Sequence, residues 1–402
     1  MNQKGFANII LVAVVAVVAI AGTVRYFALR KPSSTVHEQP PVVHNYITPI
    51  HNPNPTRPPT EPPTPIPVPK PAPKPNPTSA PCYRCDIGVY DSAKPPKAIT
   101  LTGDIQNTHD PMIIEVNGTF YSFSTDLGTS NGLMVKTSPD LLNWKSAGQL
   151  FDGTPPRPDW LQQKVPGVGG LWAPDVSYFG GAYHIYYAVA KMGSIRACIG
   201  HLSSPDFNFD NFVDRGPVVC SNVDSTDDWF AIDPNVIVDE NSKPWLAFGS
   251  FLSGIKMIEL DQSGARANDQ MYSLAARSRH ENDGAIEAPF IVRRGNYYYL
   301  FTSWESCCQG VNSKYNIRVG RSKTVIGPYV DKSNKPLMEG GGTLVLQGSG
   351  RWRGPGHNAI LLVGKKAYNV YHSYDANNNG MPTLRISELV WDTDGWPISG
   401  GP

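Results

Sequence analysis

One pattern occurs five times between about residue 90 and the C-terminus of this 402-residue chain, and this repetition constrains the fold more than any other feature. In each copy, a polar or acidic residue beside a small residue or a proline precedes an apolar run, a turn and an aromatic run. The spacing of roughly 55 to 70 residues suits units of four strands joined by irregular loops, although it exceeds that of common propeller repeats. The copies are HDPMIIEVNGTFYSFST (109–125), WAPDVSYFGGAYHIYYAVA (172–190), IDPNVIVDENSKPWLAFGS (232–250), IEAPFIVRRGNYYYLFTSW (286–304) and GHNAILLVGKKAYNVYHSY (356–374).

Turn signals lie where hairpins require them, at Asn117-Gly118, Gly180-Gly181, Arg294-Gly295 and Gly364-Lys365. The residues that flank these turns are β-branched or aromatic, and long helical periodicity is nearly absent. Segments between the copies, such as GLMVKTSPDLLNWKSAG, supply further strands. The sequence therefore predicts an all-β, five-bladed β-propeller in which the first strand of each blade lines the central axis.

Every copy carries an ionisable residue near the start of its first strand, so five such residues are expected to face one central funnel. For a single carboxylate, the capping of a loop at a strand end is the ordinary interpretation. Recurrence at related places in every copy instead favours a shared polar site. The five residues are Asp110, Asp175, Asp233, Glu287 and His357.

The register of these residues differs between copies. Counted from the proline, or from Ala359 in the last copy, Asp110 and Asp233 come one residue before, Glu287 and His357 two before, and Asp175 one after. Because side chains alternate along a strand, Glu287 and His357 would face away from the other three. We therefore expect a bulge or another distortion, at Ala288-Pro289 or in the opposing blades.

Carboxylates gathered around an axial pocket, without a nucleophilic serine or cysteine arrangement, suggest acid and base chemistry on a neutral polyhydroxylated substrate. Hydrolysis of a glycosidic bond requires one protonated carboxyl group and one ionised carboxylate. Glu287 lies between Ile286 and Pro289-Phe290, apolar surroundings that raise the pKa of a carboxyl group, and the charge of Asp233 would raise it further. Aromatic rings that could stack on a sugar, or else pack in the core, are Trp172, Trp229, Phe251 and Trp304.

The N-terminal part of the chain differs in composition from the repeats. Residues 1–31 contain an apolar stretch from Phe6 to Val24 with basic residues on both sides, which predicts a transmembrane anchor or a signal peptide cleaved after Ala21. Residues 32–85 are rich in proline and predict an extended, disordered linker. We therefore expect the propeller, residues 86–402, to lie outside the cell, either tethered to the membrane by the N-terminal segment or secreted.

Six cysteines are consistent with export, because disulfides persist in oxidising compartments. Cys198 and Cys220 are a plausible pair. Cys82 and Cys85 form a disulfide at the end of the linker or remain free thiols, since no second ligand pair for zinc follows them. For the adjacent Cys307 and Cys308, two buried small side chains in a tight bend are the favoured interpretation. The formal net charge of +1 and the absence of a basic face argue against nucleic acid as a partner.

Motifs at these positions resemble glycoside hydrolase family 43, and within it the endo-1,5-α-L-arabinanases. They follow the order of the family and cover nearly all of residues 90–402. The matching motifs are HDP (109–111), LWAPDV (171–176), AIDPNV (231–236), IEAPFI (286–291), VGRSKTVIGPYVDK (319–332), GPGHNA (354–359), YHSYDANNNG (371–380) and WDTDGWP (391–397).

The resemblance implies inverting endo-hydrolysis of arabinan. We expect a monomer without an organic cofactor. It makes Asp110 the general base, Glu287 the general acid and Asp233 the residue that tunes and orients this acid. It also places a cation, often calcium, near His357 and largely held through water. The expected substrate contacts are Asp110, Trp172, Asp175, Gly193, Phe230, Ala231, Ile232, Asp233, Ser250, Phe251 and Leu252. For Asp175 a structural role is the alternative, because the resemblance gives it no chemical role of its own.

Two other functions fit the same pattern. An exo-acting arabinofuranosidase or xylosidase would use the same propeller and release only monosaccharide. A glycan-binding propeller without activity is the other alternative, although a binding module has no need for Asp110, Asp233 and Glu287 together. The sequence departs from arabinanases at Phe230, where asparagine is usual, and at Leu252, where tryptophan is usual; both changes concern subsite preference.

Overall fold

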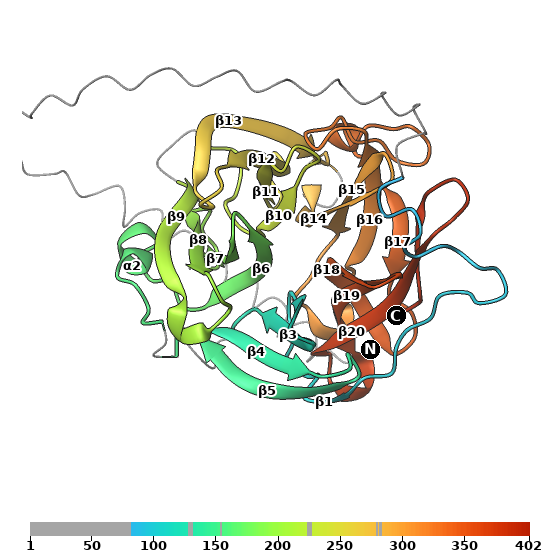
Figure 1. Cartoon of the computed structure of the whole chain (residues 1–402), viewed down its shortest axis with the longest axis horizontal. Coiled ribbons are helices and arrows are strands. Elements are labelled where there is room, and N and C mark those ends of the chain that lie inside the picture. Colours follow the sequence, from blue (N-terminus) through green and yellow to red (C-terminus); the bar gives the residue numbers. More distant parts are fainter. Residues whose placement is uncertain (1–81, 128–131, 153–154, 223–226, 279, 281–283) are drawn as a thin grey trace, which may run out of the picture. The chain divides into compact units, whose positions relative to one another are not determined.

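The computed structural model describes residues 82–402, apart from 128–131, 153–154, 223–226, 279 and 281–283 (Figure 1). The predicted anchor, residues 1–31, and residues 32–81 of the predicted linker lie outside the described part. Among the described residues, no helix is long and apolar enough to span a bilayer.

Five sheets surround one axis, as the repeats predict (Figure 1). Blade 1 contains β2 (Met112–Val116), β3 (Thr119–Ser124), β4 (Leu133–Ser138) and β5 (Asn143–Leu150), with the short β1 (Thr102–Gly103) parallel to β5. Blade 2 contains β6 (Leu171–Phe179), β7 (Ala182–Val189), β8 (Ala197–Ser204) and β9 (Val213–Ser221). Blade 3 contains β10 (Asn235–Val238), β11 (Pro244–Phe248), β12 (Ile255–Leu260) and β13 (Arg266–Ala275).

Blades 4 and 5 complete the ring. Blade 4 contains β14 (Ile286–Arg294), β15 (Tyr297–Trp304), β16 (Asn316–Ser322) and β17 (Thr343–Gln347). Blade 5 contains β18 (Trp352–Val363), β19 (Lys366–Asp375), β20 (Met381–Trp391) and β21 (Pro397–Ser399). The short helical segments are α2 (Trp160–Lys164) and the 3₁₀ turns η1 (Phe209–Asn211), η3 (Gly310–Asn312), η4 (Leu337–Glu339) and η5 (Ala376–Asn378).

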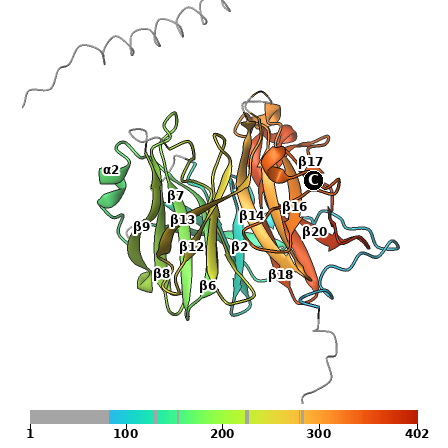
Figure 2. The ribbon, with the colours of Figure 1, turned by 90° about the horizontal axis from the view of Figure 1, so that it is seen from above.

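The first strand of each blade lies nearest the axis, as predicted. Strands β2, β6, β10, β14 and β18 contact one another in this order, and β18 contacts β2, so the ring is closed. Figure 2 shows β2, β6, β14 and β18 running side by side through the thickness of the propeller. Residues at the start of these strands therefore converge on one end of the axis.

Apolar clusters fill each of the five interfaces between neighbouring blades. Phe123 of blade 1 packs with Ile185 of blade 2, and Trp144 of blade 1 packs in the same cluster as Val370 of blade 5. The other three interfaces are filled in the same way, between blades 2 and 3, 3 and 4, and 4 and 5. Because apolar clusters cover both faces of the sheet in blade 4, β15 is buried along almost its whole length.

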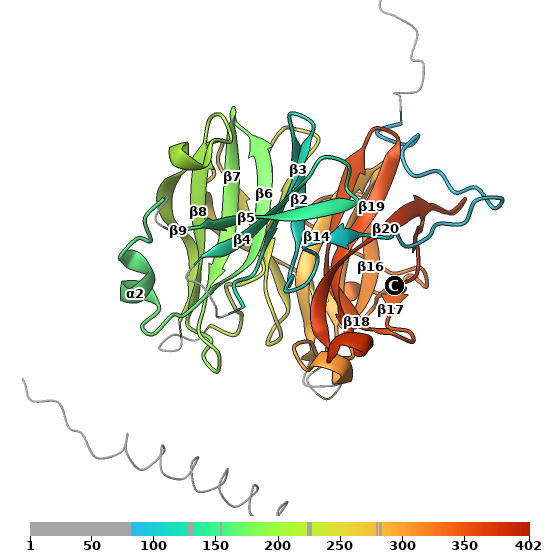
Figure 3. The ribbon, with the colours of Figure 1, turned by 90° about the horizontal axis from the view of Figure 1, so that it is seen from below.

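The N-terminal segment of the described chain fastens blade 5 to blade 1. Isolated bridges join Ala98 to Ser387 and Gln106 to Thr383 of β20, and β1 then pairs with β5 (Figure 3). Residues 82–85, which the sequence assigns to the end of the linker, are among the described residues. The backbone oxygen of Tyr83 accepts a hydrogen bond from the amide of Gly295 at 2.6 Å, which docks this segment on the hairpin of blade 4.

A left-handed corner precedes or interrupts the inner strand of every blade. The corner residue is not a glycine, its φ is positive, and in four blades it is followed by proline. The five corner residues are Asp110, Ala173, Asp233, Ala288 and His357, with φ between 45° and 59°. Such backbone conformations cost about 1–3 kcal/mol each and concentrate at functional sites.

These corners resolve the register problem. In blade 4, pairing with β15 shifts between Glu287 and Phe290, so the expected distortion at Ala288-Pro289 is confirmed. The corner breaks the alternation of side chains, and residues at the corner and just before it reach the same space. The grouping of His357 with Glu287 was wrong, because His357 is itself a corner residue, equivalent to Asp110 and Asp233.

Candidate active site

A pocket of about 980 Å³ opens at the starts of the inner strands. All five blades contribute to its lining, and the three predicted carboxylates lie in it together. A pocket of this size is in the range that binds small ligands. The predicted site residues that line it are Asp110, Trp172, Gly193, Phe230, Ile232, Asp233, Ser250, Phe251, Leu252, Glu287 and His357.

Asp110 is held by hydrogen-bond donors on both carboxylate oxygens. Oδ2 accepts from Oγ1 of Thr125 at 2.5 Å and lies 2.9 Å from Nδ1 of His109. Oδ1 lies 2.9 Å from Nδ1 of His357. Burial by itself raises the pKa of Asp110, but the interactions with His109 and His357 outweigh it and hold the pKa well below the ordinary value of 3.8. Asp110 is therefore ionised, as a general base must be.

Glu287 has the opposite environment. Oε2 accepts a hydrogen bond from Oγ of Ser250 at 2.6 Å, and Oε1 accepts one from the hydroxyl of Tyr315. Burial, followed by the charge of Asp233, raises the pKa of Glu287 from 4.5 to about 8. Glu287 therefore retains its proton at neutral pH, as a general acid must.

Asp233 acts on Glu287 by its charge and by its position. Burial raises the pKa of Asp233 to about 6, while nearby His357 lowers it. Oδ2 of Asp233 accepts a hydrogen bond at 3.1 Å from the amide of Ala288, the corner residue directly after Glu287. Asp233 thus fixes the backbone that carries the acid and places a negative charge beside it.

Two predicted substrate contacts do not line the pocket. Ala231 is fully buried, and its amide donates to Oγ of Ser221 at 3.1 Å. Asp175 is buried between blades 2 and 3, where its carboxylate accepts from Nδ2 of Asn235 at 2.8 Å and from the amide of Val236 at 3.1 Å. The structure therefore places Asp175 as a tie between inner strands, away from the pocket.

The aromatic candidates separate in the same way. Trp172 and Phe251 line the pocket. Trp304 lies 7% exposed in the core between blades 3 and 4, and Trp229 packs edge-on against Phe248. Of these four candidates, Trp172 and Phe251 are therefore the two placed to contact a sugar in this pocket.

Several residues of the site were missed by the sequence reasoning. Thr125 and His109 hold Asp110, and Tyr315 holds Glu287. Nδ1 of His372 accepts from the amide of Asp110 at 3.1 Å, and the hydroxyl of Tyr374 lies 2.8 Å from Nε2 of His109. His109 and Thr125 are the first and last residues of the first repeat, and His372 and Tyr374 lie at the end of the fifth. The sequence signal that could have identified these four residues is a second polar side chain in repeats that were already aligned.

The donor atoms around His357 restrict what kind of ion could bind there. Burial lowers the pKa of His357, but Asp110 and Asp233 outweigh this and raise it to about 9. Calcium prefers six to eight oxygen ligands, and the oxygens of Asp110 are already engaged by Thr125, His109 and His357. Among the described residues, no side chain pairs with Nε2 of His357. The residues present therefore fit an ion held by one imidazole nitrogen and water, and do not form an all-protein calcium cage.

Two other residue groups have the spacing of metal ligands: His109 with Cys307 and Cys308, and His109 with Asp110 and His372. In the first group both sulfur atoms belong to a disulfide and are not thiolates, the form in which cysteine binds metals. In the second group, the ring nitrogens that face Asp110 already contact its carboxylate or its amide.

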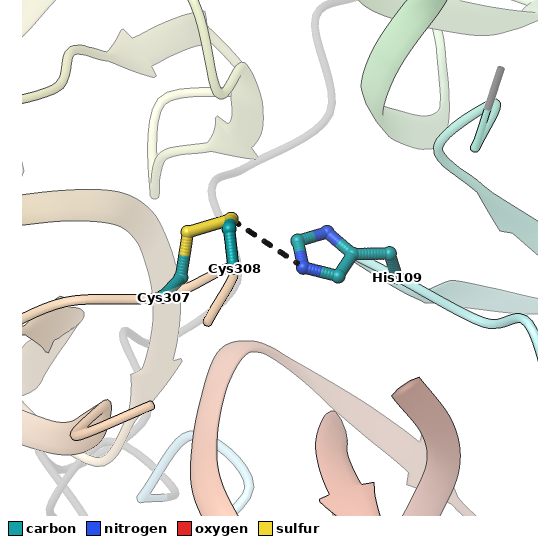
Figure 4. A group of neighbouring side chains, drawn as sticks. All are labelled: His109, Cys307 and Cys308. Carbon is teal, nitrogen blue, oxygen red and sulfur yellow. Dashed lines mark hydrogen bonds between the residues drawn. A yellow bond between two sulfur atoms is a disulfide. The ribbon is translucent and has the colours of Figure 1, made fainter. Parts of the chain in front are cut away.

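Three disulfides account for all six cysteines. Cys198 pairs with Cys220 across β8 and β9, as predicted, and Cys82 pairs with Cys85. Cys307 and Cys308 are bonded to each other (Figure 4). The interpretation of these two as buried small side chains was wrong, because Cys308 is exposed and both line the pocket.

Comparisons with known proteins agree with this geometry. The model of the glycosyl hydrolases family 43 matches residues 105–397. Over 310 residues the chain is 41% identical to the extracellular endo-α-(1->5)-L-arabinanase 1 of Bacillus subtilis (strain 168), covering 77% of this chain and 93% of that protein. It is 37% identical over 308 residues to the extracellular exo-α-(1->5)-L-arabinofuranosidase ArbA of Cellvibrio japonicus (strain Ueda107), covering 72% of this chain and 86% of that protein.

A solved structure extends the similarity to three dimensions. The family 43 endo-arabinanase from Bacillus licheniformis superposes with a TM-score of 0.69 at 43% sequence identity. The match covers 75% of this chain and 99% of that one.

Proposed function

This chain belongs to the glycosyl hydrolases family 43, and we propose from that premise that its central pocket cuts internal α-1,5 bonds of arabinan. The chain is an endo-1,5-α-L-arabinanase, as its similarity to endo-arabinanases over almost their full length supports. The observation that carries the chemistry is the opposite environment of two carboxyl groups in one pocket. Asp110 is ionised and Glu287 is protonated, each for a stated physical reason.

The reaction assigns one role to each group. Glu287 gives its proton to the glycosidic oxygen as the bond to the anomeric carbon breaks. Asp110 takes a proton from a water molecule that attacks the same carbon from the opposite face, so the product has inverted configuration. Ser250 and Tyr315 hold the two oxygens of Glu287, and Asp233 holds the backbone beside it. Thr125 and His109 hold the oxygen of Asp110 that faces them.

An ion fits this scheme at His357, beside the general base Asp110. Nε2 of His357 would hold it, with water as the other ligands, and the ion would supply positive charge near Asp110 and Asp233. Because a metal-bound imidazole must be neutral, binding there would release the proton that His357 otherwise keeps. Calcium is the expected species. Calcium addition to chelated enzyme should therefore raise the melting temperature, with His357→Gln as the variant that loses the effect.

The substrate is supported by the pocket and by the relatives. Trp172, Phe230 and Phe251 give the pocket aromatic surfaces, which suit the apolar face of a sugar ring. The location of this enzyme is extracellular, as the names of its two relatives state for them. A tether formed by residues 1–31 and the proline-rich segment that follows remains our proposal for how the propeller is displayed at the cell surface.

Product analysis tests the function. Full-length enzyme incubated with debranched arabinan should release short arabino-oligosaccharides of mixed length at early times. Arabinose alone would contradict endo action and would favour the exo alternative, for which the 37% identity to ArbA is the supporting observation. Tight binding to arabinan without release of reducing ends would instead indicate a binding module.

A further inference from the structure

The adjacent Cys307 and Cys308 form one wall of the pocket. They lie in the loop between β15 and β16, next to η3, and both line the pocket. Cys308 has φ of +65°, a left-handed conformation that residues other than glycine rarely adopt. The disulfide closes a small covalent ring around this part of the backbone, so it restricts the directions in which the Cys308 amide can point.

That amide is the first donor in a chain of hydrogen bonds. The N–H of Cys308 donates to the hydroxyl oxygen of Tyr374 at 2.8 Å. The same hydroxyl lies 2.8 Å from Nε2 of His109, and Sγ of Cys308 lies 3.8 Å from this nitrogen (Figure 4). The Tyr374 hydroxyl also interacts with the side chain of Ser313, and when its oxygen accepts from Cys308 its hydrogen is donated to His109.

The chain ends at the carboxylate of Asp110. When Nε2 of His109 accepts from Tyr374, the ring carries its hydrogen on Nδ1, which lies 2.9 Å from Oδ2 of Asp110. The hydrogen bonds of this chain then all point the same way: Cys308 donates to Tyr374, Tyr374 donates to His109, and His109 donates to Asp110. The ring of His109 also stacks on the ring of His372, with 3.9 Å between the centroids. Stacking fixes the plane of the His109 ring but not its rotation within that plane, so the hydrogen bonds must fix this rotation.

We propose that the Cys307–Cys308 disulfide and Tyr374 are positioning groups, which hold His109 and through it orient the carboxylate of Asp110. The inference rests on the proposed function, in which Asp110 is the general base. It gives the enzyme a dependence on oxidising conditions that the propeller fold alone does not require. Removal of the disulfide frees the Cys308 amide, and Tyr374 and His109 then lose their fixed orientation.

Reduction of this bond by a dithiol is a balanced exchange. The S–S bond between Cys307 and Cys308 breaks, each sulfur gains one electron and one proton as a thiol, and the dithiol is oxidised to its cyclic disulfide. The exposed position of Cys308 makes the bond accessible to such a reagent. The Cys82–Cys85 disulfide is the matched control, because it lies where the chain docks on the hairpin of blade 4.

The kinetic experiment compares three changes in the full-length enzyme: the double variant Cys307→Ser with Cys308→Ser, the variant Tyr374→Phe, and both together. We expect each change to lower kcat on debranched arabinan on the order of tenfold with KM nearly unchanged, because interactions that orient a functional group typically contribute this much. The combined variant should be no slower than either alone, since all act through one chain. Tyr371→Phe is the matched control, because its hydroxyl on the same strand bonds Ser387 in the core, at 2.9 Å, and its rate should equal that of wild type.

Treatment with dithiothreitol should reproduce the loss in wild type and in the Cys82→Ser, Cys85→Ser variant, and should leave the Cys307→Ser, Cys308→Ser variant unchanged. Wild-type kinetics in that variant, a rise in KM alone, or additive losses in the combined variant would each overturn the proposal. A rise in KM alone would mean that the disulfide contacts only the sugar.

A spectroscopic measurement separates this inference from the proposed function. Nitrogen NMR of the histidine side chains, with the His109 signal assigned by its loss in His109→Gln, should show the hydrogen on Nδ1 in wild type. Tyr374→Phe and reduction should both change that signature. If wild type is inactive on arabinan but its His109 signal changes as expected, the arabinanase assignment is refuted and the hydrogen-bond chain from Cys308 to Asp110 is retained. If wild type is active but its His109 signal does not change, the hydrogen-bond chain is refuted.

Discussion

The aromatic ring of Tyr315 lies directly against the Cα of Gly356, so that a Cβ at position 356 would come within 2.0 Å of ring atom Cδ2. Tyr315 is the residue whose hydroxyl donates to Oε1 of Glu287. The glycine of the GPGHN motif therefore provides the space in which a partner of the general acid lies.

Substitution of this glycine should act at a distance on Glu287. We expect Gly356→Ala to displace Tyr315 and to lower kcat on arabinan on the order of tenfold, similar to Tyr315→Phe. The control is Gly169→Ala, because no atom lies within 4 Å of a Cβ built at Gly169 and its φ is not in the left-handed range. Equal rates for Gly356→Ala and wild type would show that Tyr315 does not orient the acid.

The pH profile should report Glu287. This group must be protonated to act, so kcat/KM should fall as the pH rises through about 8, the raised pKa of Glu287. Asp110 must be ionised, and its pKa well below 3.8 places the acid limb far from neutrality. Because the negative charge of Asp233 raises the pKa of Glu287, Asp233→Asn should move the alkaline limb to lower pH.

A charge control belongs to the same experiment. Asp269→Asn removes one carboxylate from β13, the exposed outer strand of blade 3, and should leave the pH profile of kcat/KM unchanged. An alkaline limb that stays fixed in Asp233→Asn would show that Asp233 does not set the protonation of the acid.

Removal of Asp175 should reduce stability and spare the chemistry. Asp175→Ala leaves the amide of Val236 and Nδ2 of Asn235 buried without this acceptor, which costs roughly 1–3 kcal/mol for each group. We expect a lower free energy of unfolding by denaturant and an unchanged kcat at low temperature. Asp175→Asn, which keeps one acceptor oxygen, should lose less. A loss of kcat without a loss of stability would instead place Asp175 in the reaction.

Acid should destabilise the interface between blades 2 and 3 through a buried histidine pair. Nδ1 of His184 lies 2.8 Å from Nε2 of His201, and burial lowers the pKa of His184 to about 4 and that of His201 to about 3. The ordinary pKa of histidine is about 6.5. Because the pKa is lower in the folded chain, the unfolded chain binds more protons than the folded chain below pH 6.5. The pair's contribution is therefore fully present above pH 6.5 and is lost as the pH falls towards 3.

The melting temperature measured between pH 7 and pH 4 tests this window. His201→Gln removes one titrating group, so its melting temperature should fall less steeply with acid than that of wild type. Parallel slopes would show that other groups cause the acid sensitivity.

The repeats were sufficient to predict the five blades, because each copy contained a complete inner hairpin and the turns that close it. They were not sufficient for the register. A residue before proline ordinarily adopts an extended conformation, so nothing in Ala288-Pro289 or Asp110-Pro111 indicated a left-handed corner. The alternation rule failed there, and it grouped His357 with Glu287 although the corner groups it with Asp110.

The three carboxylates could be predicted because they recur at related places and because a family resemblance assigns their roles. Their partners could not, since these depend on contacts across the ring. His109 and Tyr374 are 265 residues apart in the chain, and Tyr315 reaches Glu287 from the loop before β16. The disulfide between Cys307 and Cys308 was hidden for a different reason, because adjacency alone does not distinguish a bonded pair from two small side chains.

The assignment of Glu287 as acid and Asp110 as base is tested most directly with an activated substrate. An aryl α-L-arabino-oligosaccharide whose phenol leaves without protonation no longer needs the acid but still needs the base. Glu287→Ala should therefore lose activity on arabinan by orders of magnitude and keep most of its kcat on the aryl substrate, whereas Asp110→Ala should lose activity on both. Retention of aryl activity in Asp110→Ala, or its loss in Glu287→Ala, would contradict the assignment.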